Sequence, residues 1–110
     1  MPVMFPGFSW HNLKPEAPLG HIPRLKGEFL WSQFFAAKAA GAGMIYVAMF
    51  DEVDEGTAIF KCTSTLPVGP TQFLDLEGLP SDHYLWLTGQ GAAMLRGELP
   101  LQATPPIRQP

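Results

Sequence analysis

The chain has 110 residues, a net charge of −3 at pH 7, an apolar content of 46% and a single cysteine. This length suits one small domain, the apolar content excludes wholesale disorder, and one cysteine excludes an internal disulfide. The acidic balance and the lack of a basic stripe argue against a nucleic-acid partner, and no apolar run approaches the length that spans a membrane.

The N-terminal part of the chain predicts a short buried strand followed by a long loop. The strand runs from Val3 to Phe8, and Pro6 and Gly7 interrupt it, which favours a bulge or a sheet edge. A polar and aromatic strand end follows, with the sequence Ser9-Trp10-His11-Asn12. Residues 13–26 carry three prolines and a glycine, so we expect a loop there.

The middle of the chain predicts a helix and a second strand. Residues 27–40 read as a helix whose apolar stripe is formed at helical spacing by Leu30, Trp31, Phe34 and Phe35. Gly41 is well placed to end this helix. The run Met44–Phe50 has seven apolar residues without alternation, which is typical of a strand buried on both faces in a parallel sheet.

The C-terminal half predicts one more helix between two irregular segments. Residues 57–79 form a long connection rich in proline and glycine, and connections of this length usually carry function or fold over a site. Ser81 is expected to cap a helix that runs to about Arg96. Residues 99–110 contain four prolines and no pattern, so we expect a disordered tail.

The order strand, helix, strand, helix defines the expected fold class. It is α/β, a βαβα unit with parallel strands, which corresponds to a quarter of a (β/α)₈ TIM-type barrel and is incomplete as it stands. Two strands cannot close a barrel, and only 15% of the residues are charged, which is low for the surface of a free-standing small domain. We therefore expect residues 1–98 to be the C-terminal part of a larger catalytic domain.

The segment Asp51–Gly56 is the strongest candidate for a functional site. It directly follows the second predicted strand and holds four of the ten carboxylates of the chain within five residues. The carboxyl ends of parallel strands are where barrel enzymes place their chemistry. Like charges at this spacing repel, so at least one carboxyl should have a raised pKa, as acid–base cleavage of a sugar bond requires.

These residues resemble a known group of enzymes. The sequence Phe50-Asp51-Glu52-Val53-Asp54-Glu55-Gly56-Thr57 is similar to the F-N-E-W-H-E-G-T motif at the last barrel strand of glycoside hydrolase family 99, the endo-α-mannosidases, and of the related family 71. Two further segments look more like a bacterial branch of this clan that is often labelled xylosidase/arabinosidase: Pro6-Gly7-Phe8-Ser9-Trp10-His11-Asn12 and Leu79-Pro80-Ser81-Asp82-His83-Tyr84. The resemblance covers roughly residues 2–98.

The resemblance implies roles for the two glutamates. Glu52 would be the general base, which takes a proton from the 2-hydroxyl of the sugar to give an epoxide-like intermediate, and Glu55 would be the general acid. Configuration would be retained without a glycosyl-enzyme bond, whereas the usual scheme uses an enzyme carboxylate as nucleophile; the sequence does not choose between these routes. Asp51, Val53 and Asp54 differ from the family motif, so mannan specificity does not carry over.

Three other residues are candidate substrate contacts. The ring of Trp10 could stack on a sugar and His11 could hydrogen-bond its hydroxyls, although both could equally be structural. Asp51 could bind a hydroxyl or tune a neighbouring pKa. A solvated acidic loop and a calcium loop are the alternatives for the turn as a whole, but its spacing differs from that of an EF-hand.

The sequence thus predicts part of a glycoside hydrolase that acts on a poly- or oligosaccharide. No cofactor and no metal are implied. We expect the isolated chain to be inactive, because most of the pocket wall would lie in missing barrel strands. The alternatives are a non-catalytic, carbohydrate-binding remnant and an oligomer of quarter units joined through exposed sheet edges. The compartment is left open, with a secreted or periplasmic parent enzyme as the expectation.

Overall fold

The computed structural model describes all 110 residues and contains two strands and two helices. In chain order they are β1 (Val3–Met4), α1 (Glu28–Ala39), β2 (Tyr46–Val47) and α2 (His83–Leu95). A short 3₁₀ turn, Leu25–Gly27, precedes α1. The predicted order of strand, helix, strand, helix is therefore confirmed, although both strands are shorter than expected. Neither helix combines the length and the apolar character that crossing a bilayer requires.

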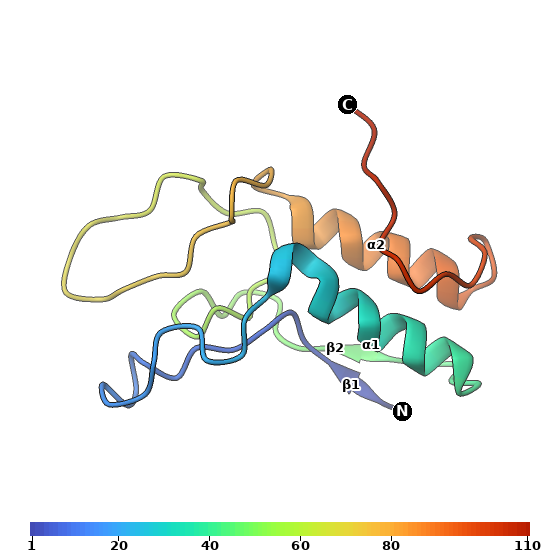
Figure 1. Ribbon diagram of the computed structural model, residues 1–110, viewed down its shortest axis with the longest axis horizontal. Coiled ribbons are helices and arrows are strands. Elements are labelled where there is room, and N and C mark those ends of the chain that lie inside the picture. The colour runs from blue at the N-terminus through green and yellow to red at the C-terminus, as the bar shows by residue number, and fades with distance from the viewer.

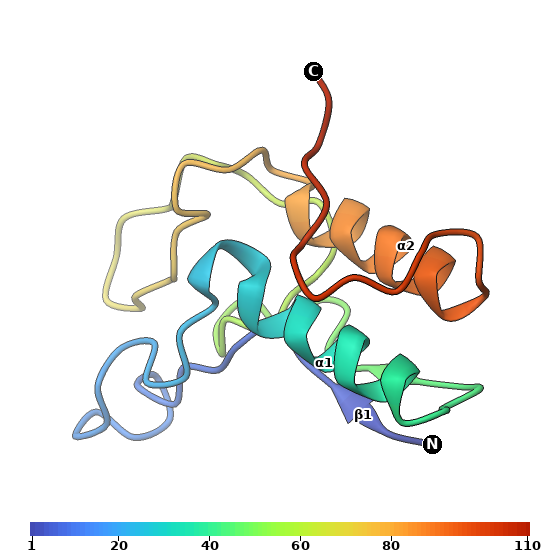
Figure 2. The same ribbon diagram turned by 45° about the vertical axis from the view of Figure 1, so that its right-hand side comes forward.

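The two strands pair in parallel, with Val3 opposite Tyr46 and Met4 opposite Val47. Figures 1 and 2 show three layers, in which the sheet lies on one side of α1 and α2 lies on the other. The loops that follow β1 and β2 extend together from the carboxyl ends of the strands, at the left of Figure 1. In a parallel pair the carboxyl ends of both strands lie at the same end of the sheet. The candidate site residues follow the strands at this end.

The expectation that Met44–Phe50 is buried on both faces is wrong for this chain. Met44, Tyr46 and Phe50 keep 67%, 55% and 58% of their surface exposed. Successive strand residues point to opposite faces of a sheet, and only one face here is covered by a helix. Met4 therefore enters the core beneath α1, whereas the paired residues Val3 and Tyr46 face outward.

Both helices end in the same glycine-based motif. After α1, Gly41 has a φ of +85°, its N–H donates to Lys38 O, and the next N–H donates to Ala37 O. After α2, Gly97 repeats this geometry with a φ of +80°. This pair of bonds satisfies carbonyls that the last helical turn leaves free, and the positive φ explains why glycine is required.

The start of α2 differs from the expectation. Ser81 does not cap the helix; Asp82 occupies the N-cap position and its side chain caps no backbone N–H. The carboxylate of Asp82 instead accepts two hydrogen bonds from Arg108 near the C-terminus, the longer at 3.0 Å. Residues 99–110 contain no helix or strand. A second contact holds this segment, because the indole N–H of Trp31 donates to Gln102 O at 3.0 Å.

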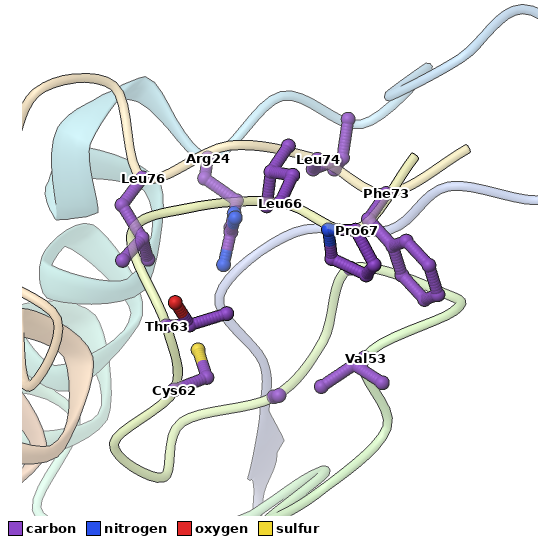
Figure 3. A pocket seen from close by; sticks show the side chains of 11 residues that line it. Arg24, Val53, Cys62, Thr63, Leu66, Pro67, Phe73, Leu74 and Leu76 are labelled. Carbon is purple, nitrogen blue, oxygen red and sulfur yellow. The ribbon is translucent and has the colours of Figure 1, made fainter. Parts of the chain in front are cut away.

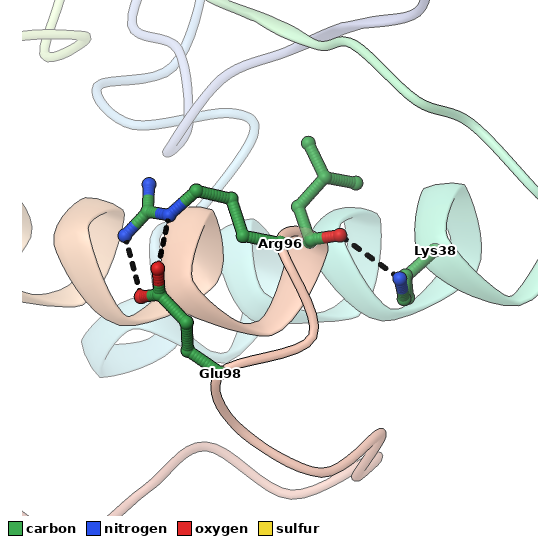
Figure 4. A network of polar contacts seen from close by, with 4 residues as sticks. Lys38, Arg96 and Glu98 are labelled. Atoms are coloured by element: carbon green, nitrogen blue, oxygen red, sulfur yellow. Dashed lines mark hydrogen bonds and ion pairs between the residues drawn. The ribbon is translucent and has the colours of Figure 1, made fainter.

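The two helices pack through a close approach at Gly91. A Cβ at this position would lie 2.5 Å from the ring of Phe34, so the aromatic face of α1 sits directly on the backbone of α2. At the far end of this pair, Lys38 Nζ donates to the C-terminal carbonyl of Leu95 at 2.9 Å (Figure 4). A cation suits this position because the helix dipole is negative at its C-terminus.

Candidate functional site

The acidic turn is a closed loop at the end of β2. The carbonyl of Glu52 accepts hydrogen bonds from the backbone N–H of Thr57 at 3.1 Å and from its hydroxyl at 3.3 Å. Within this loop the N–H of Gly56 donates to Val53 O at 3.3 Å, and Gly56 has a φ of +66°. The Gly-Thr pair of the motif therefore fixes the backbone that carries both glutamates.

The segment after β1 lies directly against this turn. The N–H of Ser9 donates to Glu55 O at 2.7 Å, and the side-chain amide of Asn12 donates to Asp54 O at 2.9 Å. Asn12 also exchanges hydrogen bonds with the backbone of Gln72, at 2.8 and 3.4 Å. Asn12 thus ties the acidic turn to the long connection, a role that its sequence position at a strand end did not reveal.

The four carboxylates of the turn interact electrostatically. The pKa of Glu52 is raised, first by a hydrogen bond with the carboxyl of Asp54, then by desolvation, and then by the negative charges of Asp54, Glu55 and Asp51. The expectation of a raised pKa in this turn thus holds at Glu52. A raised pKa brings a carboxyl closer to neutral pH, where it can accept or donate a proton, so the shift by itself assigns neither role.

The other candidate residues lie at or beside the turn. Glu52 and Glu55 are half-buried and Asp51 is exposed, so none of the three is locked inside the core. Trp10 is 42% exposed, and Lys14 Nζ lies 4.7 Å from the centre of its ring. His11 uses Nδ1 in a 2.8 Å hydrogen bond with Ala17 O, within its own loop. No hydrogen bond joins either aromatic side chain to the turn.

The side chains offer no ready metal site. No group of three or more histidine, cysteine, aspartate or glutamate side chains is arranged to hold an ion. The carboxylates at this rim can bind hydroxyls and move protons, and the partly exposed indole of Trp10 belongs to the segment that is hydrogen-bonded to the turn.

No protein-family model and no curated protein matches the chain. Solved structures of the GH99 endo-α-mannosidase from Bacteroides thetaiotaomicron are similar to it, each with 27% sequence identity and a TM-score of 0.76. The alignment with the structure in complex with BIS-TRIS propane covers 88% of this chain and 30% of the enzyme chain. The alignment with a second structure covers 87% of this chain and 28% of the enzyme chain. The chain has the fold of part of a GH99 enzyme.

This match confirms the resemblance predicted from the acidic motif and its neighbours. The described residues form a small α/β piece, two parallel strands and two helices, that corresponds to part of a GH99 domain. The chain spans about 30% of the length of the solved GH99 relative. The chain is therefore structurally related to part of a glycoside hydrolase.

Proposed function

We propose that residues 1–98 are the C-terminal βαβα portion of a (β/α)₈ glycoside hydrolase and supply its acid–base pair. The observation that carries the proposal is the superposition on the GH99 enzyme, combined with an E-x-x-E-G-T turn at the carboxyl end of a parallel strand. A barrel enzyme places its catalytic side chains at that rim.

The proposed reaction assigns one proton transfer to each glutamate. Glu52 accepts the proton of the sugar 2-hydroxyl as that oxygen bonds to the anomeric carbon. The glycosidic C–O bond breaks at the same time, and Glu55 donates a proton to the leaving oxygen. The motif register assigns base and acid, and the raised pKa of Glu52 is compatible with either role. An enzyme carboxylate acting as nucleophile is the alternative route.

The substrate class is a poly- or oligosaccharide. Trp10, His11 and Asp51 are proposed as sugar contacts, because they lie on the turn or on the segment that is hydrogen-bonded to it. Val53 stands where the endo-α-mannosidase motif has tryptophan. A smaller side chain there changes the shape of the subsite, so the sugar is not proposed to be mannose.

The isolated chain is not proposed to turn over substrate. It spans less than a third of the GH99 relative, so most of the wall that would hold a sugar comes from outside these residues. The alternative function is a non-catalytic, carbohydrate-binding remnant, which the exposed ring of Trp10 would favour.

A chimeric enzyme tests the proposal. The matching segment of the Bacteroides enzyme is replaced by residues 1–98, and hydrolysis is measured on a panel of aryl glycosides of different sugars, with mannose as one of them. We expect activity that falls at least about a thousandfold in Glu52→Gln and in Glu55→Gln, because each removes a proton transfer step. Glu16→Gln, an exposed carboxylate outside the turn, is the matched control and should retain activity.

Circular dichroism and thermal melting would show which chimeras fold. A folded chimera that stays active without Glu52 or Glu55 would contradict the proposal. Sugar-induced NMR shifts at Trp10 in the isolated chain, lost in Trp10→Ala and accompanied by an inactive folded chimera, would support the remnant instead.

A further inference from the structure

A cavity lies behind the acidic turn, on the side of the long connection. It has a volume of about 180 Å³ and is lined mainly by apolar side chains. Figure 3 shows Phe73 at the right of the cavity and Leu66 above it, with Leu76, Thr63 and Cys62 at the left. An apolar cavity of about 150 Å³ accommodates a benzene molecule, so this space suits one small ring or a branched alkyl group.

Arg24 is the only charged residue in the lining of this cavity. Its side chain points from the loop before α1 toward Cys62 and Thr63 (Figure 3). Arg24 retains only 6% of its surface exposure. Burial removes much of the hydration of this side chain, but solvent still reaches the guanidinium nitrogens that lack a partner, because Tyr84 OH is the one fully buried side-chain polar atom without a partner.

The protein compensates this buried charge only in part. Arg24 Nη2 donates to Asp75 O at 2.7 Å, and the guanidinium lies 4.7 Å from the centre of the Tyr84 ring. No carboxylate forms an ion pair with it. A guanidinium has five N–H donors, so most of the donors of Arg24 have no acceptor within the protein.

Two acidic residues that share a second hollow with Arg24 use their carboxylates in other hydrogen bonds. Asp75 Oδ1 accepts the N–H of Glu77 at 3.1 Å, and the carboxylate of Glu77 accepts the N–H of Lys26 at 3.2 and 3.3 Å. Both face a second hollow beside Arg24 rather than the apolar cavity. The cavity therefore presents free cationic donors next to apolar walls, without a competing anion.

We propose that this cavity binds the carboxylate of a small apolar acid, with the carboxylate on Arg24 and the hydrocarbon part between Leu66, Phe73 and Leu76. A carboxylate matches the forked geometry of a guanidinium and forms charge-assisted hydrogen bonds with it. The ring or branched chain supplies van der Waals contacts that the apolar walls lack while the cavity is empty. Val53 and Gly56 of the acidic turn also line this cavity, but the recognition proposed here rests on Arg24 and not on Glu52 or Glu55.

Cys62 allows the site to be tested in the unmodified chain, because it is the only cysteine and it lines the cavity. The rate of alkylation of Cys62 by iodoacetamide is measured with benzoate and with benzamide, which has the same shape and no charge. We expect benzoate to slow alkylation at a concentration at least about tenfold lower than benzamide, since bonds to charged groups are the stronger ones.

Two variants show whether Arg24 carries the recognition. Arg24→Met should remove the preference for benzoate, whereas Lys61→Met, which removes an exposed cation next to Cys62, should leave it unchanged. Loss of protection in Lys61→Met alone would mean that benzoate is held by surface charge and would overturn the proposal. If Arg24→Met fails to fold, the comparison of benzoate with benzamide in the unmodified chain still decides. Equal protection by both compounds, or none by either, would overturn the proposal.

Discussion

A side-chain hydrogen bond with Asp54 raises the pKa of Glu52 in the acidic turn. The hydrogen bond with Asp54 is the largest cause of the raised pKa of Glu52, and the charge of Asp51 is the smallest. Asp54→Asn should therefore lower the pKa of Glu52, because it removes a charge and offers an amide donor to the ionised form. Asp51→Asn is the matched control and should lower it less. An NMR titration of the Glu52 carboxyl carbon measures both.

The same shift gives the turn a pH-dependent contribution to stability. The folded state binds the proton of Glu52 more tightly than the unfolded chain, in which the pKa of this carboxyl has its ordinary value of 4.5. The contribution is therefore fully present below that value and is lost as pH rises through the raised pKa of the folded state. Chemical unfolding is measured at pH values from below 4.5 to above the raised pKa of Glu52. The free energy of unfolding should fall less over this range in Asp54→Asn than in the parent chain. A pH profile that Asp54→Asn leaves unchanged would contradict the assignment.

Local sequence predicted the raised pKa in this turn but not the hydrogen bonds that distant residues form with it and around it. Four carboxylates within five residues predicted a raised pKa through repulsion, but its largest cause is the side-chain hydrogen bond between Glu52 and Asp54, which depends on the geometry of the turn. The bond from Asn12 to Asp54 joins residues 42 positions apart, and Arg24 meets Asp75 across 51 positions. Only the tertiary structure brings such pairs together. The prediction of a loop at residues 13–26 therefore gave no indication that Arg24 is buried.

The helices and the existence of two parallel strands were predictable, whereas the length and the burial of the strands were not. An apolar stripe at helical spacing and a terminal glycine lie within one segment, so α1 and the end of α2 follow from local sequence. The burial of a strand depends on what covers its two faces. The apolar run Met44–Phe50 predicts two covered faces, but the chain supplies one helix layer and leaves Tyr46 exposed.

The packing of α1 against α2 depends on a single glycine. Gly91→Ala should destabilise the fold by about 1–3 kcal/mol, because the new methyl group would overlap the ring of Phe34 and force the helices apart. Gly89→Ala lies two residues earlier on the exposed side of α2, where nothing is within 4 Å of the added carbon. It should stabilise by about 0.5–1 kcal/mol through helix propensity alone.

Urea unfolding of the two variants measures this difference. The pair controls for the change of residue type, since both replace glycine by alanine within one helix. A Gly91→Ala variant as stable as Gly89→Ala would mean that the helices do not approach each other as closely as the structure shows.

At the scale of the whole molecule, the chain exposes more surface than its size requires. Its accessible area is 6547 Å², whereas a compact monomer of 12.1 kDa exposes about 6,000 Å². Part of the excess is apolar and lies on the sheet face opposite α1, where Val3 and Tyr46 are paired and exposed. The low charge content pointed to an incompletely covered surface, but only the strand register shows which face is bare.

This bare face predicts self-association of the isolated chain. Sedimentation at micromolar concentration should show dimers or larger species, because Val3, Tyr46 and the unpaired strand edges offer a surface that a second copy can cover. The double variant Val3→Lys/Tyr46→Lys should stay monomeric to at least about tenfold higher concentration, which corresponds to roughly 1.4 kcal/mol of lost association energy. Val68→Lys, in the long connection and 102% exposed, is the control and should associate like the parent chain. A parent chain that remains monomeric at these concentrations would show that the bare sheet face does not drive association.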